Sequence, residues 1–317
     1  MLELAEFLHY ISIALVVGVN AVSVGIGEGM TGSSAIEAIN IQPQAKNEIT
    51  TAAIIGMALV ETAAITGISI AMILLLGAQG INKTIYFGLS ELGIAFAVSF
   101  SGFAIGIVSA WPAQSSCLAI ARQPFIGKKI FRFMLITQSL IQTPVIFSFI
   151  IAMFIKNQSI SVNTAAETLR LIASGLCIGL GSIGPAIGQA NFARAACSSI
   201  GVNKKSYNKI FPFTLISEAI IETPIIFALV VSLILIGSKA STLLQGIAMI
   251  SAAFCIGIGT IGPGIGSGKT SAQACKQIAK NPEIYSTISK VSMFGQGMID
   301  TAAIYALMIS LSLILFV

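Results

Sequence analysis

An acidic or amide residue recurs in this chain within apolar stretches, at intervals of 78 to 81 residues. The four residues are Glu61, Gln142, Glu222 and Asp300, and each is followed by a threonine: Thr62, Thr143, Thr223 and Thr301. A carboxylate inside an apolar segment of membrane-spanning length costs roughly 2.5 to 3.5 kcal/mol on insertion scales and usually marks an ion pathway. The pattern therefore predicts ion binding by carboxylates inside a membrane.

A second polar residue lies 33 residues before each member of this series: Glu28, Ser109, Gln189 and Ser267. In two antiparallel helices joined midway, both members of such a pair lie at one depth, roughly 20 to 25 Å from the turn at about 1.5 Å per residue. A cation between Glu28 and Glu61 would relieve the repulsion of two carboxylates. The alternative, in which these residues only fix helix register by hydrogen bonding, explains their recurrence at one depth less well.

The composition predicts an integral membrane protein surrounded by lipid. Of the 317 residues 56% are hydrophobic and only 9% are charged, and the mean hydropathy is +0.94, which leaves too little polar surface for a water-soluble domain. The spacing predicts an all-α fold of eight transmembrane helices. They form four tandem antiparallel hairpins, assigned to residues 1–80, 81–160, 161–240 and 241–317.

Basic residues indicate how the hairpins are oriented. Most lie in the predicted turns within hairpins, whereas the opposite side carries only Lys83, Lys156, Arg170 and Lys239. By the positive-inside rule, the turns within hairpins face the cytoplasm or an equivalent compartment, and both termini face the other side. The net charge of +5 is explained by this topology, so no nucleic-acid partner is expected.

The two helices of each hairpin differ in composition. Every first helix is rich in glycine and alanine, which let helix backbones approach closely in lipid, so we expect the first helices to form a tightly packed inner layer. The second helices carry bulkier apolar residues and should lie outside. Pro144 and Pro224 are expected to kink two of them, and His9 is expected at the membrane boundary.

Motifs that resemble nucleotide-binding loops are better explained by helix packing. Residues 179–184 and 257–262 match G-x-G-x-x-G, but both lie at the same repeat position inside a predicted membrane helix and follow no strand. Residues 266–270 resemble the end of a phosphate-binding loop, but Pro263 replaces its first glycine. We therefore predict that the chain is not an enzyme by itself and needs no cofactor.

Several segments together resemble the c subunit of rotary F-type ATP synthases, four times over and along essentially the whole chain. The segments are Gly184-Pro185-Ala186-Ile187-Gly188-Gln189, Gly262-Pro263-Gly264-Ile265-Gly266-Ser267-Gly268, Ala121-Arg122-Gln123-Pro124, and Gly295-Gln296-Gly297-Met298-Ile299-Asp300-Thr301-Ala302-Ala303-Ile304-Tyr305. The resemblance implies a rotor ring of several copies whose second-helix carboxylates carry H⁺ or Na⁺. It also implies a stator a subunit that supplies an arginine, and central-stalk subunits that contact the loops and couple rotation to ATP synthesis or hydrolysis.

Carried over by position, the resemblance assigns the ion carriers to Glu61, Glu222 and Asp300. The supporting ligands would be Glu28, Gln189, Ser267, Thr62, Thr223, Thr301 and Tyr305. Possible Na⁺ sites are then Glu28 with Glu61 and Thr62, and Gln189 with Glu222 and Thr223. Protons remain the alternative, because a proton needs only a carboxyl group.

The chain departs from the family pattern in its second repeat. Gln142, paired there with Ser109, replaces the carboxylate and cannot exchange a proton, so three active sites per chain are predicted. The residues expected to contact the stalk are Gln42, Pro43, Arg122, Gln123, Pro124, Asn281 and Pro282. The third repeat lacks this loop motif and has Lys204 where the proline would be.

Other assignments remain open at this point. A V-type proteolipid, working as an ion pump, is the nearest alternative, since such duplicated subunits also have a silent half. An internally repeated secondary transporter would also place acids in the membrane, whereas a structural pore built of hairpins would leave the carboxylates without a role. Three near-equivalent sites in parallel hairpins favour a ring, in a bacterial inner membrane or an equivalent organellar membrane.

Overall fold

The computed structural model describes residues 2–77 and 84–316. The predicted boundary between the first two hairpins, at residues 80 and 81, and Lys83 lie outside the described residues. The other predicted boundaries fall in the short connections that precede Ala165 and Leu243.

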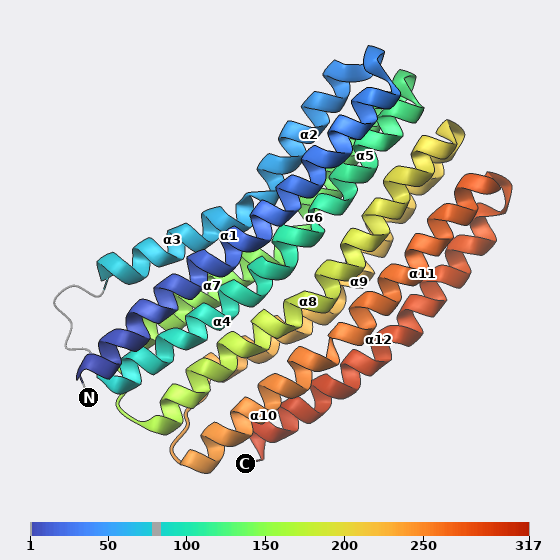
Figure 1. Cartoon of the computed structure of the whole chain (residues 1–317). Coiled ribbons are helices and arrows are strands. Elements are labelled where there is room, and N and C mark those ends of the chain that lie inside the picture. The colour runs from blue at the N-terminus through green and yellow to red at the C-terminus, as the bar shows by residue number, and fades with distance from the viewer. Residues whose placement is uncertain (1, 78–83, 317) are drawn as a thin grey trace.

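Four helical hairpins follow one another along the chain (Figure 1). The first hairpin consists of α1 (Leu2–Ile41), the 3-10 turn η1 (Pro43–Ala45), α2 (Lys46–Val60) and α3 (Thr62–Gly77). The second consists of α4 (Ile85–Val108), α5 (Ala110–Arg122), η2 (Pro124–Ile126), α6 (Gly127–Ile141) and α7 (Thr143–Ser159). The third consists of α8 (Ala165–Val202), η3 (Lys204–Ser206) and α9 (Tyr207–Gly237). The fourth consists of α10 (Leu243–Gly259), α11 (Ile261–Lys280), η4 (Pro282–Ile284) and α12 (Tyr285–Leu315).

Within the described residues, eight helical segments are long and apolar enough to cross a membrane. Each segment is one arm of a hairpin, and four arms contain a local break, so that α2 and α3, for example, belong to one arm. The four turns lie at one end of the molecule, and both termini lie at the other (Figure 1). The predicted all-α fold of eight membrane-spanning helices is confirmed.

The first arms pack side by side in chain order. Helix α4 contacts both α1 and α8, and α8 in turn contacts α10 and α11. Glycine makes this approach possible: a Cβ atom added to Gly27 would lie 2.1 Å from the carbonyl oxygen of Gly106, and one added to Gly188 would lie 2.0 Å from that of Gly264. The first arms therefore form the closely packed inner layer that the small residues predict.

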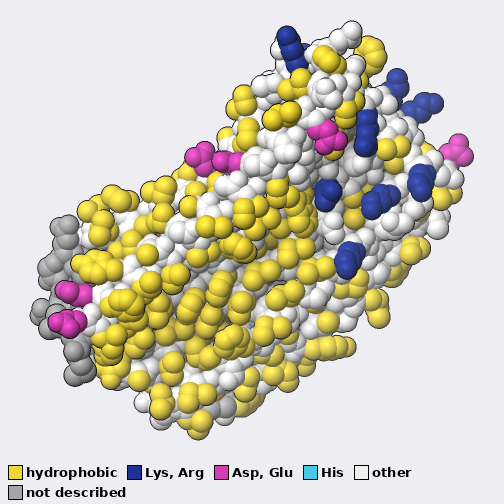
Figure 2. All heavy atoms as spheres, viewed as in Figure 1, with side chains coloured by type: hydrophobic (Ala, Val, Ile, Leu, Met, Phe, Trp, Pro, Cys, Tyr) yellow, Lys and Arg dark blue, Asp and Glu magenta, His cyan; other side chains and the backbone are white. Residues whose placement is uncertain are grey.

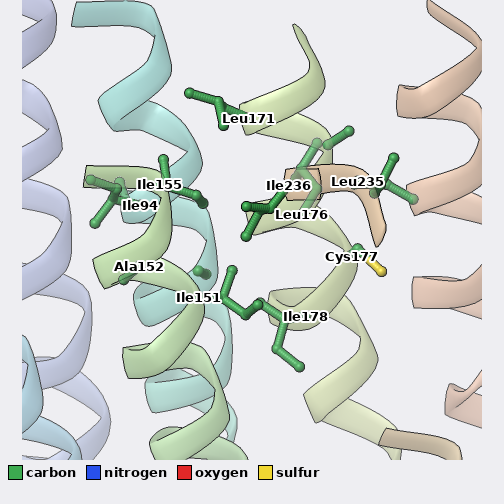
Figure 3. Close-up of a cluster of buried hydrophobic side chains, with 14 of the residues drawn as sticks. Ile94, Ile151, Ala152, Ile155, Leu171, Leu176, Cys177, Ile178, Leu235 and Ile236 are labelled. Atoms are coloured by element: carbon green, nitrogen blue, oxygen red, sulfur yellow. The ribbon is translucent and has the colours of Figure 1, made fainter. Parts of the chain in front are cut away.

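The second arms lie against this layer and touch their own neighbours, α3 with α7, α7 with α9, and α9 with α12. Bulkier side chains fill the space between the two layers. Figure 3 shows part of this core, where Ile94 of α4, Ile151 of α7, Ile178 of α8 and Leu235 of α9 come together, all of them fully buried.

Prolines do not account for the helix breaks in the way the sequence suggests. One break falls at Gln142, two residues before Pro144, but Pro224 lies inside the continuous helix α9. The other break in a second arm falls at Glu61, where the sequence has no proline. A helix break thus accompanies Pro144 but not Pro224, and a bend of the continuous helix at Pro224 stays a prediction.

All four turns have one backbone conformation. An extended residue, Gln42, Gln123, Asn203 or Asn281, with φ between −141° and −135°, precedes each 3-10 turn. The third turn keeps this shape although Lys204 stands where the others have proline. Figure 2 shows lysine and arginine side chains gathered over this end of the molecule, with hydrophobic side chains covering most of the remaining face.

A buried cluster of charged groups links the first two hairpins near the opposite end. Nδ1 of His9 in α1 lies 2.5 Å from one carboxylate oxygen of Glu91 in α4, and Nζ of Lys156 in α7 donates to the other at 2.9 Å. All three side chains are at least nine-tenths buried. The depth of His9 relative to the membrane boundary stays a prediction, whereas Lys156 lies within α7 and not in a connection.

We predict that replacing Lys156 by methionine destabilises the folded chain, because Glu91 would keep a buried charge without its strongest partner. Removing one partner of a buried ion pair costs about 3 to 5 kcal/mol. A thermal unfolding scan in detergent should show a clear drop for Lys156→Met. Lys239→Met, at an exposed lysine near the same end, serves as the control. Adding Glu91→Gln to Lys156→Met should recover part of the loss; no recovery would show that the charge is not the cause.

Candidate ion-binding site

At mid-helix, the side chain of Gln142 makes two hydrogen bonds between neighbouring second arms. Its Nε2 donates a hydrogen bond to the carbonyl oxygen of Leu59 at 3.0 Å, and its Oε1 accepts one from the hydroxyl of Thr62 at 2.6 Å. Both partners belong to the preceding hairpin. Leu59 stands two residues before Glu61 and Thr62 one residue after it. Both residues therefore flank the acid of their own hairpin but form hydrogen bonds with Gln142 of the next hairpin.

The other three members of the series differ in exposure. Asp300 is 8% exposed, Glu222 is half-buried, and Glu61 is exposed. The second arms that carry Glu222 and Asp300 each contact the second arm of the preceding hairpin, α7 with α9 and α9 with α12. In a single chain the first hairpin has no preceding one, so Glu61 lies on a free edge.

The partners 33 residues upstream lie at the predicted depth. The hydroxyl of Ser267 donates to Oδ1 of Asp300 at 3.4 Å, and the carboxyl group of Glu28 is close enough to that of Glu61 to interact with it electrostatically. Gln189 is fully buried in α8, and neither of its amide atoms has a hydrogen-bond partner among the described residues. Ser109, in the repeat that lacks the acid, is also buried with a hydroxyl that has no such partner.

The threonines lie in a different grouping from the one that the sequence suggests. Thr62 contacts Gln142 of the next hairpin, and the side chain of Thr143 likewise interacts with the carboxyl group of Glu222. In the third hairpin the hydroxyl of Thr223 is directed to the carbonyl oxygen of Ala219 at 3.3 Å. Thr62 and Thr143 thus each contact the residue at the acid position of the next hairpin, Gln142 and Glu222, whereas the hydroxyl of Thr223 bonds within its own helix.

The last hairpin presents the same groups without a neighbour. The hydroxyl of Thr301 lies 2.7 Å from the carbonyl oxygen of Met298, as that of Thr62 lies 2.8 Å from the carbonyl oxygen of Leu59. Met298 is 72% exposed, so this pair of oxygens lies on the second free edge of the chain. Tyr305 is 65% exposed, and in the described part of the chain its hydroxyl makes no hydrogen bond to Asp300.

The residues predicted to contact a stalk all lie at the end with the four turns. Arg122, Pro43 and Asn281 are exposed, and Gln42, Gln123, Pro124 and Pro282 are partly exposed. Adjacent turns are also tied together: the side-chain amide of Asn203 donates to the carbonyl oxygen of Ala279 at 2.8 Å, and Lys209 donates to that of Pro282 at 2.6 Å.

The structure adds two groups to those predicted from the sequence. The first is the backbone carbonyl of Leu59, whose role no side-chain pattern could reveal. The second is Glu218, which is fully buried in α9 one turn before Glu222, with both carboxyl oxygens unpartnered among the described residues. A signal for Glu218 existed, because polar residues occupy that position in three of the four repeats: Gln138, Glu218 and Gln296.

Four tandem hairpins of membrane-spanning helices, with polar residues recurring at mid-helix, define a class of membrane protein built from repeated two-helix units. Comparison with known sequences identifies the family. The profile of the ATP synthase C subunit family matches the chain four times, at residues 11–74, 92–155, 172–235 and 250–313. The chain belongs to this family, and it is a rotor proteolipid of a rotary ATPase.

Individual relatives match either one hairpin or several. An ATP synthase c subunit of Cereibacter sphaeroides, the one numbered 2, is 44% identical over 66 residues, which cover 21% of this chain and 80% of the relative. The ATP synthase c subunit of Thermotoga maritima is 38% identical over 79 residues, covering 24% and 93%. The K subunit of the A-type ATP synthase of Methanocaldococcus jannaschii is 25% identical over 236 residues, covering 72% of this chain and 97% of the relative.

We predict that each threonine acts on the acid of the next hairpin. Thr143→Val should weaken ion binding at Glu222, and Thr223→Val should weaken it at Asp300, each by roughly fivefold, because one hydrogen bond contributes about 1 kcal/mol. The measurement is the rate of carbodiimide modification at each acid in the assembled complex, read by mass spectrometry. If Thr223→Val altered Glu222 instead, the threonine would serve its own hairpin.

Proposed function

We propose that Glu61, Glu222 and Asp300 each carry one H⁺ or Na⁺ as the rotor turns, so that four hairpins carry three ions. The observation that supports this most directly is the pair of hydrogen bonds made by Gln142. Its amide nitrogen donates a hydrogen bond to the carbonyl oxygen of Leu59, and its amide oxygen accepts one from the hydroxyl of Thr62. An amide has no exchangeable charge at this position, so the second repeat would carry no ion. The groups that could bind one there are already hydrogen-bonded to Gln142.

Each ion would lie between two hairpins. For Glu222 the ligands would be its own carboxylate, the amide of Gln189, and the hydroxyl of Thr143 with the carbonyl of Leu140 from the preceding arm. For Asp300, Ser267 replaces the amide, and the preceding arm supplies Thr223 and the carbonyl of Ile220.

The site of Glu61 needs a second copy of the chain. Its own hairpin offers Glu28, but the hydroxyl and carbonyl that a preceding arm supplies elsewhere would come from Thr301 and Met298 of a neighbouring copy. Their local geometry matches that of Thr62 and Leu59. Exposed groups at the two free edges of the chain thus complement each other, which is the arrangement that closes a ring of several copies.

The partners follow from this arrangement. A stator a subunit would present an arginine to the outward-facing carboxylates, release their ions and allow reloading. Central-stalk subunits would contact the turns, where Arg122, Gln123, Pro124, Pro282 and the surrounding lysines are accessible. The turns would face the cytoplasm or an equivalent compartment, and ATP synthesis or hydrolysis would take place on the soluble partners.

The second candidate function for the same rotor is ion pumping driven by ATP hydrolysis. It is favoured by the missing carboxylate, because fewer ions per turn at a fixed number of ATP molecules let each ATP work against a steeper gradient. The similarity to the K subunit of an A-type ATP synthase over 72% of the chain is compatible with either direction.

We predict that Gln142→Glu adds a fourth carrier, because the carbonyl of Leu59 and the hydroxyl of Thr62 already flank that position. Residue 142 should become reactive toward carbodiimide, and the ions moved per ATP by the reconstituted complex should rise toward the ratio for four sites per chain. Gln142→Leu is the matched control and should leave the ratio unchanged. A wild-type ratio that already corresponds to four ions per chain would refute the proposal of a silent repeat.

The transported ion can be identified by testing whether Na⁺ protects the carboxyl groups from carbodiimide modification. Oxygen ligands are those that hard cations such as Na⁺ take, and Glu222 has the fullest set, whereas Asp300 has a hydroxyl in place of the amide. We predict that Na⁺ slows carbodiimide modification of Glu222 more than that of Asp300. If Na⁺ protects neither residue at alkaline pH, the transported ion is H⁺, and the rotor function is unaffected.

A further inference from the structure

Two prolines stand at one repeat position, two residues after the acid position. They are Pro144 in the second hairpin and Pro224 in the third, whereas the first and fourth hairpins have Ala63 and Ala302 there. Proline has no backbone N–H, so the carbonyl four residues earlier loses its helical hydrogen-bond donor. The carbonyls affected are those of Leu140 and Ile220.

These carbonyls are the repeat equivalents of the one that Gln142 contacts. Leu59 stands two residues before Glu61, and its carbonyl oxygen accepts a hydrogen bond across the contact between hairpins at 3.0 Å. Leu140 and Ile220 stand two residues before Gln142 and Glu222 in the same way. From this repeat equivalence we expect the carbonyls of Leu140 and Ile220 to be directed toward the acids of the next hairpins, Glu222 and Asp300.

The two freed carbonyls differ in what remains bound to them. The hydroxyl of Thr143 donates to the carbonyl oxygen of Leu140, which takes one of its two lone pairs. In the third hairpin, the hydroxyl of Thr223 is directed to Ala219 and leaves Ile220 aside. The backbone N–H of Gln142 is also directed to the carbonyl oxygen of Leu140, whereas no side chain of the described residues donates to that of Ile220, which lies in a region without water to satisfy it.

We propose that Pro144 and Pro224 are positioning residues that free the carbonyls of Leu140 and Ile220 as ligands for the ions at Glu222 and Asp300. The inference rests on the proposed ion-carrying role of these two acids and holds for either ion. A protonated carboxyl group would donate its O–H to the freed carbonyl, and Na⁺ would take the carbonyl as an oxygen ligand.

The proline positions make the three carboxyl sites unequal. Glu222 and Asp300 each follow an arm with a proline, so each meets a carbonyl released from its helix. Glu61 would meet Met298 of a neighbouring copy, where Ala302 keeps its N–H and α12 is continuous. The Glu61 site therefore binds its ion with the weakest backbone contribution of the three.

The test is to replace each proline and read every acid separately in the assembled complex. Pro224→Ala should weaken ion binding at Asp300 by about fivefold, the effect of one interaction of hydrogen-bond strength, and leave Glu222 unchanged. Pro144→Ala should weaken Glu222 and leave Asp300 unchanged. The readout is the Na⁺ concentration, or the pH in a Na⁺-free buffer, that halves the carbodiimide reactivity of each residue.

The design separates the inference from a local structural effect, because Pro224 is two residues from Glu222 but would act on Asp300. Alanine favours the helix over proline, so both variants should fold. Pro212→Ala removes another proline of α9, far from the acid, and should change neither site. If Pro224→Ala altered Glu222 or left both sites at the wild-type value, the inference would be wrong. If no acid responded to Na⁺ or pH even in the wild type, the proposed function would fail instead.

Discussion

A carboxyl group held among lipid tails must obtain its polar partners from protein, because no water is available to it. At Gln142 those partners come from the neighbouring hairpin, from Leu59 and Thr62, whereas Asp300 is contacted by Ser267 of its own hairpin. The distance between adjacent second arms therefore affects whether these hydrogen bonds can form. It is set by the inner layer, where Gly188 meets the backbone of Gly264 so closely that a single methyl group would collide with it. Glycine packing on one side of the molecule therefore determines the site geometry on the other.

The end of the molecule away from the turns is held by polar contacts that also cross between hairpins. Lys156 and His9 share Glu91 between the first and second hairpins. Between the second and third, Arg170 donates to Gln158 at 2.9 Å and to the carbonyl oxygen of Ile236. The third and fourth hairpins are linked instead at the other end, through their turns, so these polar contacts hold each pair of adjacent hairpins at one end.

Much of the architecture could be predicted from the sequence, because it depends on spacing along one hairpin. Apolar lengths gave the eight arms, and the constant separation of 33 residues placed Ser267 beside Asp300. Features that depend on which neighbour a helix face meets could not be predicted. Thr62 contacts Gln142 of the next hairpin, Glu91 binds partners 82 and 65 residues away, and the first hairpin's second arm breaks at Glu61 without a proline. None of these features follows from a local sequence pattern.

The covalent joining of four hairpins constrains the symmetry of any ring that the chain forms. Hairpins can enter such a ring only in groups of four, so its size changes in coarse increments and its rotational symmetry equals the number of chains, not the number of hairpins. Four consecutive angular positions within each chain are then chemically distinct. If the second repeat carries no ion, as proposed above, the free energy profile for rotation has one long period per chain, and the stretch opposite Gln142 is crossed without an ion.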